Sequence, residues 1–207
     1  MKTPLDELFI TTCSKYSENH SLIIKYWNEI EVSYSHKDRA YHNLDHLSNM
    51  IDELALVENE IEEKDTLLFA IFYHDIIYKS TSKHNEEKSA EWASIRLRNL
   101  NLKPQQISKV TQHIIATQKH EKSIDHDTNC LLDLDLAILG KDWNTYQNYI
   151  QQIRKEYALF PNFIYDPGRK KVLNHFLALD EIYKTDRFKS IYETQARTNI
   201  IKEIDLL

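Results

Sequence analysis

The stretch AIFYHDIIY, residues 70–78, is apolar except at His74 and Asp75. It belongs to a longer, nearly all-apolar run over residues 67–77, which predicts a helix buried at the centre of the fold. A buried carboxylate without a partner is very costly, so it is normally paired or bound to a metal. The interrupted run therefore predicts both a central helix and a candidate site on that helix.

A second apolar run, LLDLDLAIL at residues 131–139, is interrupted only by Asp133 and Asp135. Two such interruptions in one chain suggest that they meet in the folded protein. A His-Asp dipeptide alone is a weak signal, because it fits a core histidine bonded to its neighbours equally well. The two aspartates lie two positions apart, so we do not expect both to face one ion.

The composition favours helices throughout. The 207 residues include only 2 glycines and 4 prolines, whereas strand-rich folds use both at many tight turns. We find no internal repeat and no low-complexity linker, so residues 1–207 are expected to form a single all-α domain, a helical bundle. Apolar spacing and capping residues predict helices near residues 4–15, 22–31, 43–56, 67–77, 104–119, 129–139, 142–160, 166–182 and 186–204, and one beginning at the N-cap Asn85.

Charge and composition also exclude some partners. The net charge is -6 with no long basic run, so no nucleic-acid partner is expected. No stretch approaches the ~20 apolar residues of a membrane span, and the N-terminus lacks the apolar core of a signal peptide. Cys13 and Cys130 are expected to be free thiols in a reducing cytoplasm. An exposed apolar helix face would suit a homodimer.

The segment YHNLDH, residues 41–46, places His42 and His46 four positions apart, on one face of a helix. With this segment the chain resembles the HD superfamily of metal-dependent phosphohydrolases. That family is recognised by a histidine, a later His-Asp pair and a distant aspartate on separate helices. The corresponding order here is His46, then His74 and Asp75, then Asp135. The resemblance implies a helical bundle of HD-domain type in which these residues bind a divalent metal ion.

Two branches of the superfamily are relevant. YHNLDH is similar to the signature of the cyclic-nucleotide phosphodiesterases, which implies that His46 binds metal and His42 protonates the leaving group. Most of the chain resembles an uncharacterised bacterial group of predicted HD phosphohydrolases, through residues 41–43, 85–87, 133–140 and 196–199. The family pattern favours Asp135 over Asp133 as the ligand. A buried Asp133 is then expected to hydrogen-bond a ligand histidine.

The residue types suit phosphoester hydrolysis. A divalent ion held by two imidazoles and two carboxylates lowers the pKa of a bound water and polarises phosphoryl oxygens. Nitrogen and oxygen ligands without thiolate suit Mn, Fe, Co, Ni or Zn, and Mg also fits because a substrate phosphate can complete its coordination. The expected activity is hydrolysis of a small-molecule phosphate ester such as a nucleotide, by attack of a metal-bound water.

Further acids and arginines are candidates beside this set. Glu86 and Glu87 are first-turn helix acids in the simpler interpretation. The resemblance makes one of them a candidate for orienting the water, and we assign this role to Glu87. Arg169 and Arg197 are candidates for phosphate binding, because a guanidinium fits phosphate bidentately. Arg197 fits a structural ion pair equally well.

His113, Thr117 and His120 share one helix face, which is either a partly exposed polar surface or a wall that contacts phosphate or a second metal.

Three alternatives to a small-molecule phosphohydrolase remain at this point. The first is a phosphodiesterase, although the chain is shorter than the cyclic-nucleotide phosphodiesterase domains. The second is a regulatory protein that holds a nucleotide at the metal pocket without turnover. The third is a structural helical protein, which leaves both interrupted apolar runs unexplained.

Overall fold

The computed structural model describes residues 4–207, and within this range the chain forms helices and no β-strand. In chain order they are α1 (Leu5–Ser14), α2 (His20–Tyr34), α3 (Leu44–Leu54), η1 (Glu58–Glu60), α4 (Lys64–Tyr73), α5 (Asn85–Asn99), α6 (Pro104–Ala116), α7 (His126–Leu136), η2 (Ala137–Gly140), α8 (Trp143–Glu156), α9 (Asn162–Ala178) and α10 (Asp186–Leu206). The predicted all-α fold is confirmed. Among the described residues, no helix has the length and apolar character needed to cross a membrane.

Helix α4 lies at the centre, as its sequence predicts. Residues 66–73 are all buried, and α4 packs against α1, α3, α5, α6 and α7. The Phe9 ring of α1 meets Phe69 and Phe72 edge-on, with centroid distances of 6.5 and 5.2 Å. Because α4 has no polar face, it is stable only where neighbours cover every side.

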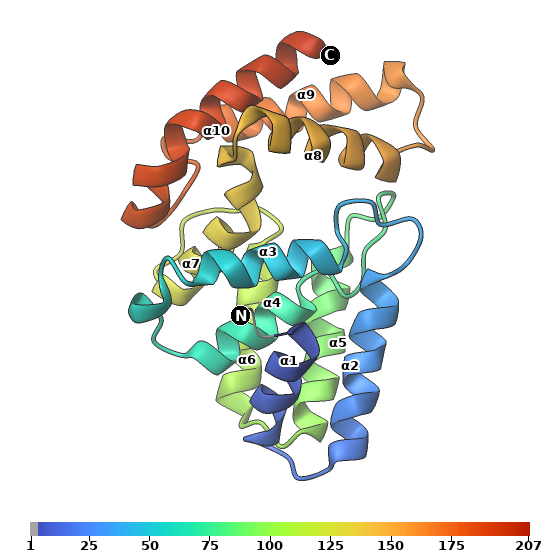
Figure 1. Ribbon diagram of the computed structural model, residues 1–207, viewed down its shortest axis with the longest axis vertical. Helices are drawn as coiled ribbons and strands as arrows, with labels where there is room; N and C mark the ends of the chain where they lie inside the picture. Colours follow the sequence, from blue (N-terminus) through green and yellow to red (C-terminus); the bar gives the residue numbers. More distant parts are fainter. Residues whose placement is uncertain (1–3) are drawn as a thin grey trace.

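The helices form two parts joined through α7 and η2 (Figure 1). One part contains α1, α2, α4, α5 and α6, and the other contains α8, α9 and α10, with α3 and α7 lying between them in the view of Figure 1. α7 packs against α3, α4 and α6, whereas η2 packs against α8 and α10. The chain therefore passes from one part to the other along a single continuous segment.

Gly140 marks the closest approach between η2 and α10. A Cβ added at Gly140 would lie 2.4 Å from the Cβ of Tyr192, so only glycine fits. The side-chain amide of Asn199 donates to the carbonyls of Leu139 and Lys141, at 2.8 Å each. η2 ends at Gly140, and none of the described glycines has a positive φ. Close packing is the reason for glycine here.

Several predicted boundaries differ from the structure. α4 ends at Tyr73, so His74 and Asp75 lie in the turn after it. His42 precedes α3, whose N-cap is Asn43. α9 begins well before Asp166 and continues through Pro167, at the cost of one backbone hydrogen bond.

The Asn85 side chain does not cap α5 but bonds the N–H and carbonyl of Lys79, at 3.2 and 3.0 Å. Asn85 thereby fixes the loop that follows the His-Asp pair.

Two buried acids of α7 anchor neighbouring helices. Asp127 accepts the N–H groups of Glu62 and Glu63, at 2.9 and 2.8 Å, at the start of α4. Asp133 accepts the N–H groups of Lys184 and Thr185, at 2.6 and 2.8 Å, at the start of α10. The expectation that Asp133 bonds a ligand histidine is wrong. A helix start offers unpaired N–H groups that stabilise a carboxylate directly.

Candidate metal centre

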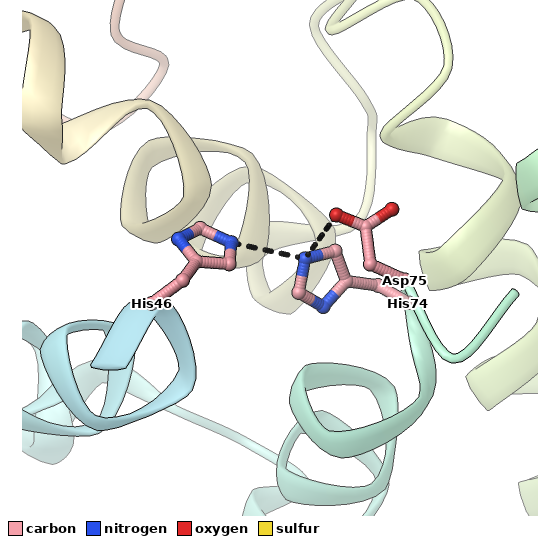
Figure 2. Close-up of side chains that lie close together, drawn as sticks. All are labelled: His46, His74 and Asp75. Carbon is pink, nitrogen blue, oxygen red and sulfur yellow. Dashed lines mark hydrogen bonds and ion pairs between the residues drawn. The ribbon is translucent and has the colours of Figure 1, made fainter. Parts of the chain in front are cut away.

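Two elements far apart in the chain bring His46, His74 and Asp75 together (Figure 2). His46 lies in the first turn of α3, and His74 and Asp75 follow the end of α4. The Nε2 atom of His74 is 3.2 Å from His46 Nε2 and 3.4 Å from Asp75 Oδ2. The ligand atoms of all three residues lie within 4.8 Å of one another, so the cluster could hold a metal ion.

Asp135 reaches the same place from α7. Its Oδ1 atom is 3.2 Å from His46 Nε2 and 3.8 Å from His74 Nε2. Metal bonds to nitrogen and oxygen are about 2.0–2.2 Å long, which separates neighbouring donors of a tetrahedral site by roughly 3.3–3.6 Å. The observed separations are close to this range. The two interrupted apolar runs therefore do meet, at atoms spaced as metal ligands are.

The His74 ring is held in one orientation. Its Nδ1–H donates to the carbonyl of Ile71 at 2.8 Å, so Nε2 is the ring nitrogen left for a proton or a metal ion. Nε2 points toward His46 and the carboxylates of Asp75 and Asp135. A carbonyl partner behind a metal-binding histidine is a common way to fix its tautomer. The centre thus brings two imidazole nitrogens and two carboxylates together, an arrangement that attracts a cation.

The electrostatics of the cluster favour positive charge. Burial opposes protonation of His74, but Asp75 and Asp135 outweigh it and raise the pKa of the His74 imidazole to about 9. Burial also raises the pKa of Asp75, yet His74 outweighs this effect and lowers it to about 2. In Asp135, hydrogen bonds with His120 and His46 overcome burial and hold the pKa well below its usual range. Both carboxylates are therefore ionised, and at neutral pH they face the protonated His74, whose proton a metal ion would displace.

Arg39 and Tyr34 fix the turn that carries Asp75. Arg39 donates to the carbonyls of Asp75 and Ile76, at 2.7 and 3.0 Å, and its guanidinium lies 4.8 Å from the Tyr34 ring centroid. The Tyr34 hydroxyl accepts the N–H of Asp75 at 3.1 Å. Sequence reasoning missed Arg39, because it lies in a polar stretch with no apolar pattern around it.

His42 lies at the edge of the centre, with its Nε2 atom 3.9 Å from Asp75 Oδ2. The Nδ1 atom of His42 is 2.7 Å from Oε2 of Glu156. The imidazole stacks on the Tyr78 ring, with the two ring centroids 4.2 Å apart. Burial lowers the pKa of His42, but Glu156 and Asp75 outweigh it, so the pKa is raised. His42 is thus held as a proton donor that faces the cluster.

Glu156 positions this segment from the end of α8. Its Oε1 atom accepts the N–H groups of Tyr41 and His42, at 2.7 and 2.9 Å, and Tyr78 donates to Oε2 at 2.9 Å. Sequence reasoning missed Glu156, since an acid near a helix end usually faces solvent. Only the fold shows that it is buried.

His120 and His113 separate in the structure. His120 Nε2 is 2.9 Å from Asp135 Oδ2, and His120 adopts a left-handed backbone with φ 52°. A non-glycine residue in this region is strained, and such strain is frequent at functional sites. His113 is buried elsewhere, with Nδ1 2.8 Å from the Thr128 hydroxyl. The shared wall does not form because α6 ends at Ala116, before His120.

Glu87 lies on the surface rather than at the cluster. It accepts a hydrogen bond from Gln118 at 2.9 Å and is 3.6 Å from His84 Nδ1. Glu86 is half-buried, and burial together with Asp75 raises its pKa. Of these two acids of α5, Glu86 is therefore the one whose pKa the charges of the centre affect.

The two arginines predicted to bind phosphate have protein partners. Arg197 bonds Glu193 at 2.7 Å and the carbonyls of residues 177, 179 and 180, which argues against a phosphate role. Arg169 lines the cavity beside the centre but pairs with Glu203 through two hydrogen bonds, at 2.7 and 3.1 Å. Its charge is thus already balanced.

No family model, curated protein or solved structure matches this chain. The resemblance noted in the sequence therefore stays an expectation. The assignment of the centre depends on the geometry of its own side chains.

Proposed function

We propose that the protein is a metal-dependent phosphoric ester hydrolase, with His46, His74, Asp75 and Asp135 holding one divalent ion. One observation carries the proposal. The Nε2 atom of His74 faces another imidazole and two ionised carboxylates, with separations of 3.2–3.8 Å. Two buried carboxylates that converge on imidazole nitrogens attract a cation, and a divalent ion would take the place of the proton on His74.

The chemistry of the donors supports hydrolysis. When bound, such an ion supplies an activated water and neutralises phosphoryl charge. Two imidazole nitrogens and two carboxylates suit a first-row transition metal, and Mg²⁺ fits if a substrate phosphate completes its coordination.

His42 supplies the proton that the leaving group needs. Water adds to phosphorus, and the bond from phosphorus to the organic oxygen breaks with its electron pair on that oxygen. His42 donates its proton to this oxygen, and the proton that the attacking water gives up returns to His42 through solvent, so the products are an alcohol and hydrogen phosphate. Glu156 holds the ring at 2.7 Å, and its charge favours the protonated imidazole.

The proposal is tested by elemental analysis of protein purified without chelator. The expected content is about one divalent ion per chain, lost in Asp75→Ala and retained in the control Asp180→Ala, which removes an exposed aspartate. The metal found is then used in a screen of phosphate monoesters and diesters, which separates a phosphatase from a phosphodiesterase. A native protein that holds no metal, and takes up none of Mn, Co, Ni, Zn or Mg, would contradict the proposal. Metal and tight nucleotide binding without turnover would instead support a regulatory protein.

A further inference from the structure

A cavity of about 440 Å³ opens directly beside the candidate metal centre. His42, His120 and Asp135 line this cavity and also belong to the surroundings of the centre. The volume lies within the roughly 300–1,000 Å³ of typical small-molecule sites. A phosphate bound at the centre would therefore place its organic group in this cavity.

The cavity wall is aromatic and aliphatic. The ring centroids of Tyr41 and Tyr149 are 4.7 Å apart, and those of Tyr157 and Tyr165 are 5.9 Å apart. Among the described residues that line the cavity, none is a serine, threonine, asparagine or glutamine. Such a wall binds aromatic or aliphatic groups, because they gain free energy from burial and from stacking on its rings. Apart from the histidines and charged residues, the polar side-chain atoms of the described lining are the hydroxyls of five tyrosines, so the wall offers more apolar and aromatic surface than hydrogen-bond partners.

The mouth of the cavity on α9 is apolar as well. Ile164 and Val172 both line the cavity, and they are 49% and 46% exposed. Exposed apolar side chains at the entrance of a pocket are typical of a binding groove. The apolar character therefore continues from the interior to the surface.

The basic residues of the cavity wall leave little positive charge for a second phosphate group on the substrate. Within the described lining, Arg169 is the single fixed cation, and Glu203 takes two of its hydrogen bonds. His42 likewise faces Glu156, and His120 faces Asp135. Further phosphate groups would enter a wall whose basic residues already have acidic partners.

We infer that the substrate carries a single phosphate on an aromatic or otherwise largely apolar organic group. This inference rests on the proposed function, because the cavity receives a leaving group only if a phosphate binds at the metal centre. Burying one ring of this size is worth about 10- to 100-fold in kcat/KM.

The test compares kcat/KM of the metal-loaded protein on four esters. Benzyl phosphate and glycerol phosphate both release a primary alcohol, so their ratio reports the contribution of the organic group. A nucleoside 5′-monophosphate and the 3′,5′-bisphosphate differ by one added phosphate. We expect kcat/KM on benzyl phosphate to exceed kcat/KM on glycerol phosphate by at least about 10-fold. Of the two nucleotides, we expect the bisphosphate to have the lower kcat/KM.

Matched variants separate the cavity from general effects. Val172→Asn removes an apolar side chain from the cavity mouth, whereas Ile201→Asn removes a similarly exposed one from α10 outside the cavity. Only the first is expected to reduce the preference for benzyl phosphate, by several-fold.

Equal kcat/KM on benzyl and glycerol phosphate, or a preference for the bisphosphate, would overturn the inference. If the metal-loaded protein hydrolyses no ester, the proposed function fails instead. Calorimetry with the same two esters then decides the cavity preference: tighter binding of benzyl phosphate supports it and equal binding overturns it.

Discussion

Helix α7 places two aspartates, two residues apart, against different regions of the molecule. Asp133 faces the start of α10, where two N–H groups and the Thr185 hydroxyl donate to it. Asp135 faces the other region, where its neighbours are the Nε2 atoms of His46, His74 and His120. Both carboxylates lie in an apolar run, yet their partners differ in kind.

This difference separates a structural acid from a candidate ligand. Asp133 is satisfied by donors within the protein, so nothing further is needed at that place. Asp135 shares His74 with Asp75, so two carboxylates converge on one imidazole nitrogen, and among the described residues no backbone N–H group donates to either of them. The type of partner distinguishes the two roles, and burial alone does not.

The largest expected effect comes from Asp135→Asn. The substitution keeps the size of the side chain but removes one of the two carboxylate charges at the centre. Loss of an outer partner of a metal typically costs 10- to 100-fold, so loss of a direct ligand should lower kcat/KM by more than about 100-fold. Metal content and hydrolysis should fall together while the helical circular dichroism spectrum is unchanged. Full metal content in this variant would remove Asp135 from the ligand set.

Asp133→Asn is the reciprocal variant. Its amide replaces a carboxylate oxygen that accepts N–H groups, so the free energy of unfolding should fall by about 2–4 kcal/mol. For a chain of this length that corresponds to a melting temperature lower by roughly 5–15 °C. Metal content per folded chain should stay as in the native protein. A normal melting temperature with lost metal would reverse the roles of the two aspartates.

The apolar runs carried most of what could be predicted. They indicated the central helix α4 and the meeting of two polar interruptions, because an apolar run with isolated charges has few stable alternatives. Helix existence was predicted well, since apolar spacing and the N-cap at Asp142 are local signals.

Contacts between distant segments could not be predicted in the same way. Whether Asp133 or Asp135 faces the histidines depends on where α10 begins, and position alone does not decide it. Glu156 is 114 residues from His42 in the chain, so no local pattern links them. Arg39 acts on backbone carbonyls, which any sequence offers.

Glu156 accepts backbone N–H groups, as Asp133 does, and also faces a histidine, as Asp135 does. It therefore tests whether the type of partner determines the role of a buried acid. Glu156→Gln keeps one oxygen for the N–H groups of Tyr41 and His42 but removes the charge beside the His42 ring. We expect kcat to fall about 10- to 100-fold with KM and metal content unchanged, because general acids typically contribute 10²–10⁴-fold. Tyr78→Phe is the control, since it removes one hydrogen bond from the same carboxylate but keeps its charge. An equal loss in both variants would indicate a packing role for Glu156.

The smallest effects are expected on α5, where Glu86 and Glu87 differ only in the region that they face. Glu86 is half-buried and its pKa responds to Asp75 and Asp135, whereas Glu87 is exposed and bonds Gln118. Glu86→Gln should change kcat by less than about 10-fold, the low end for a group that acts beside a reaction centre. Glu87→Gln should leave kcat and metal content as in the native protein. If Glu87→Gln lowers kcat more than Glu86→Gln does, the water-orienting role belongs to Glu87. The region that a carboxylate faces would then predict its role less well on α5 than on α7.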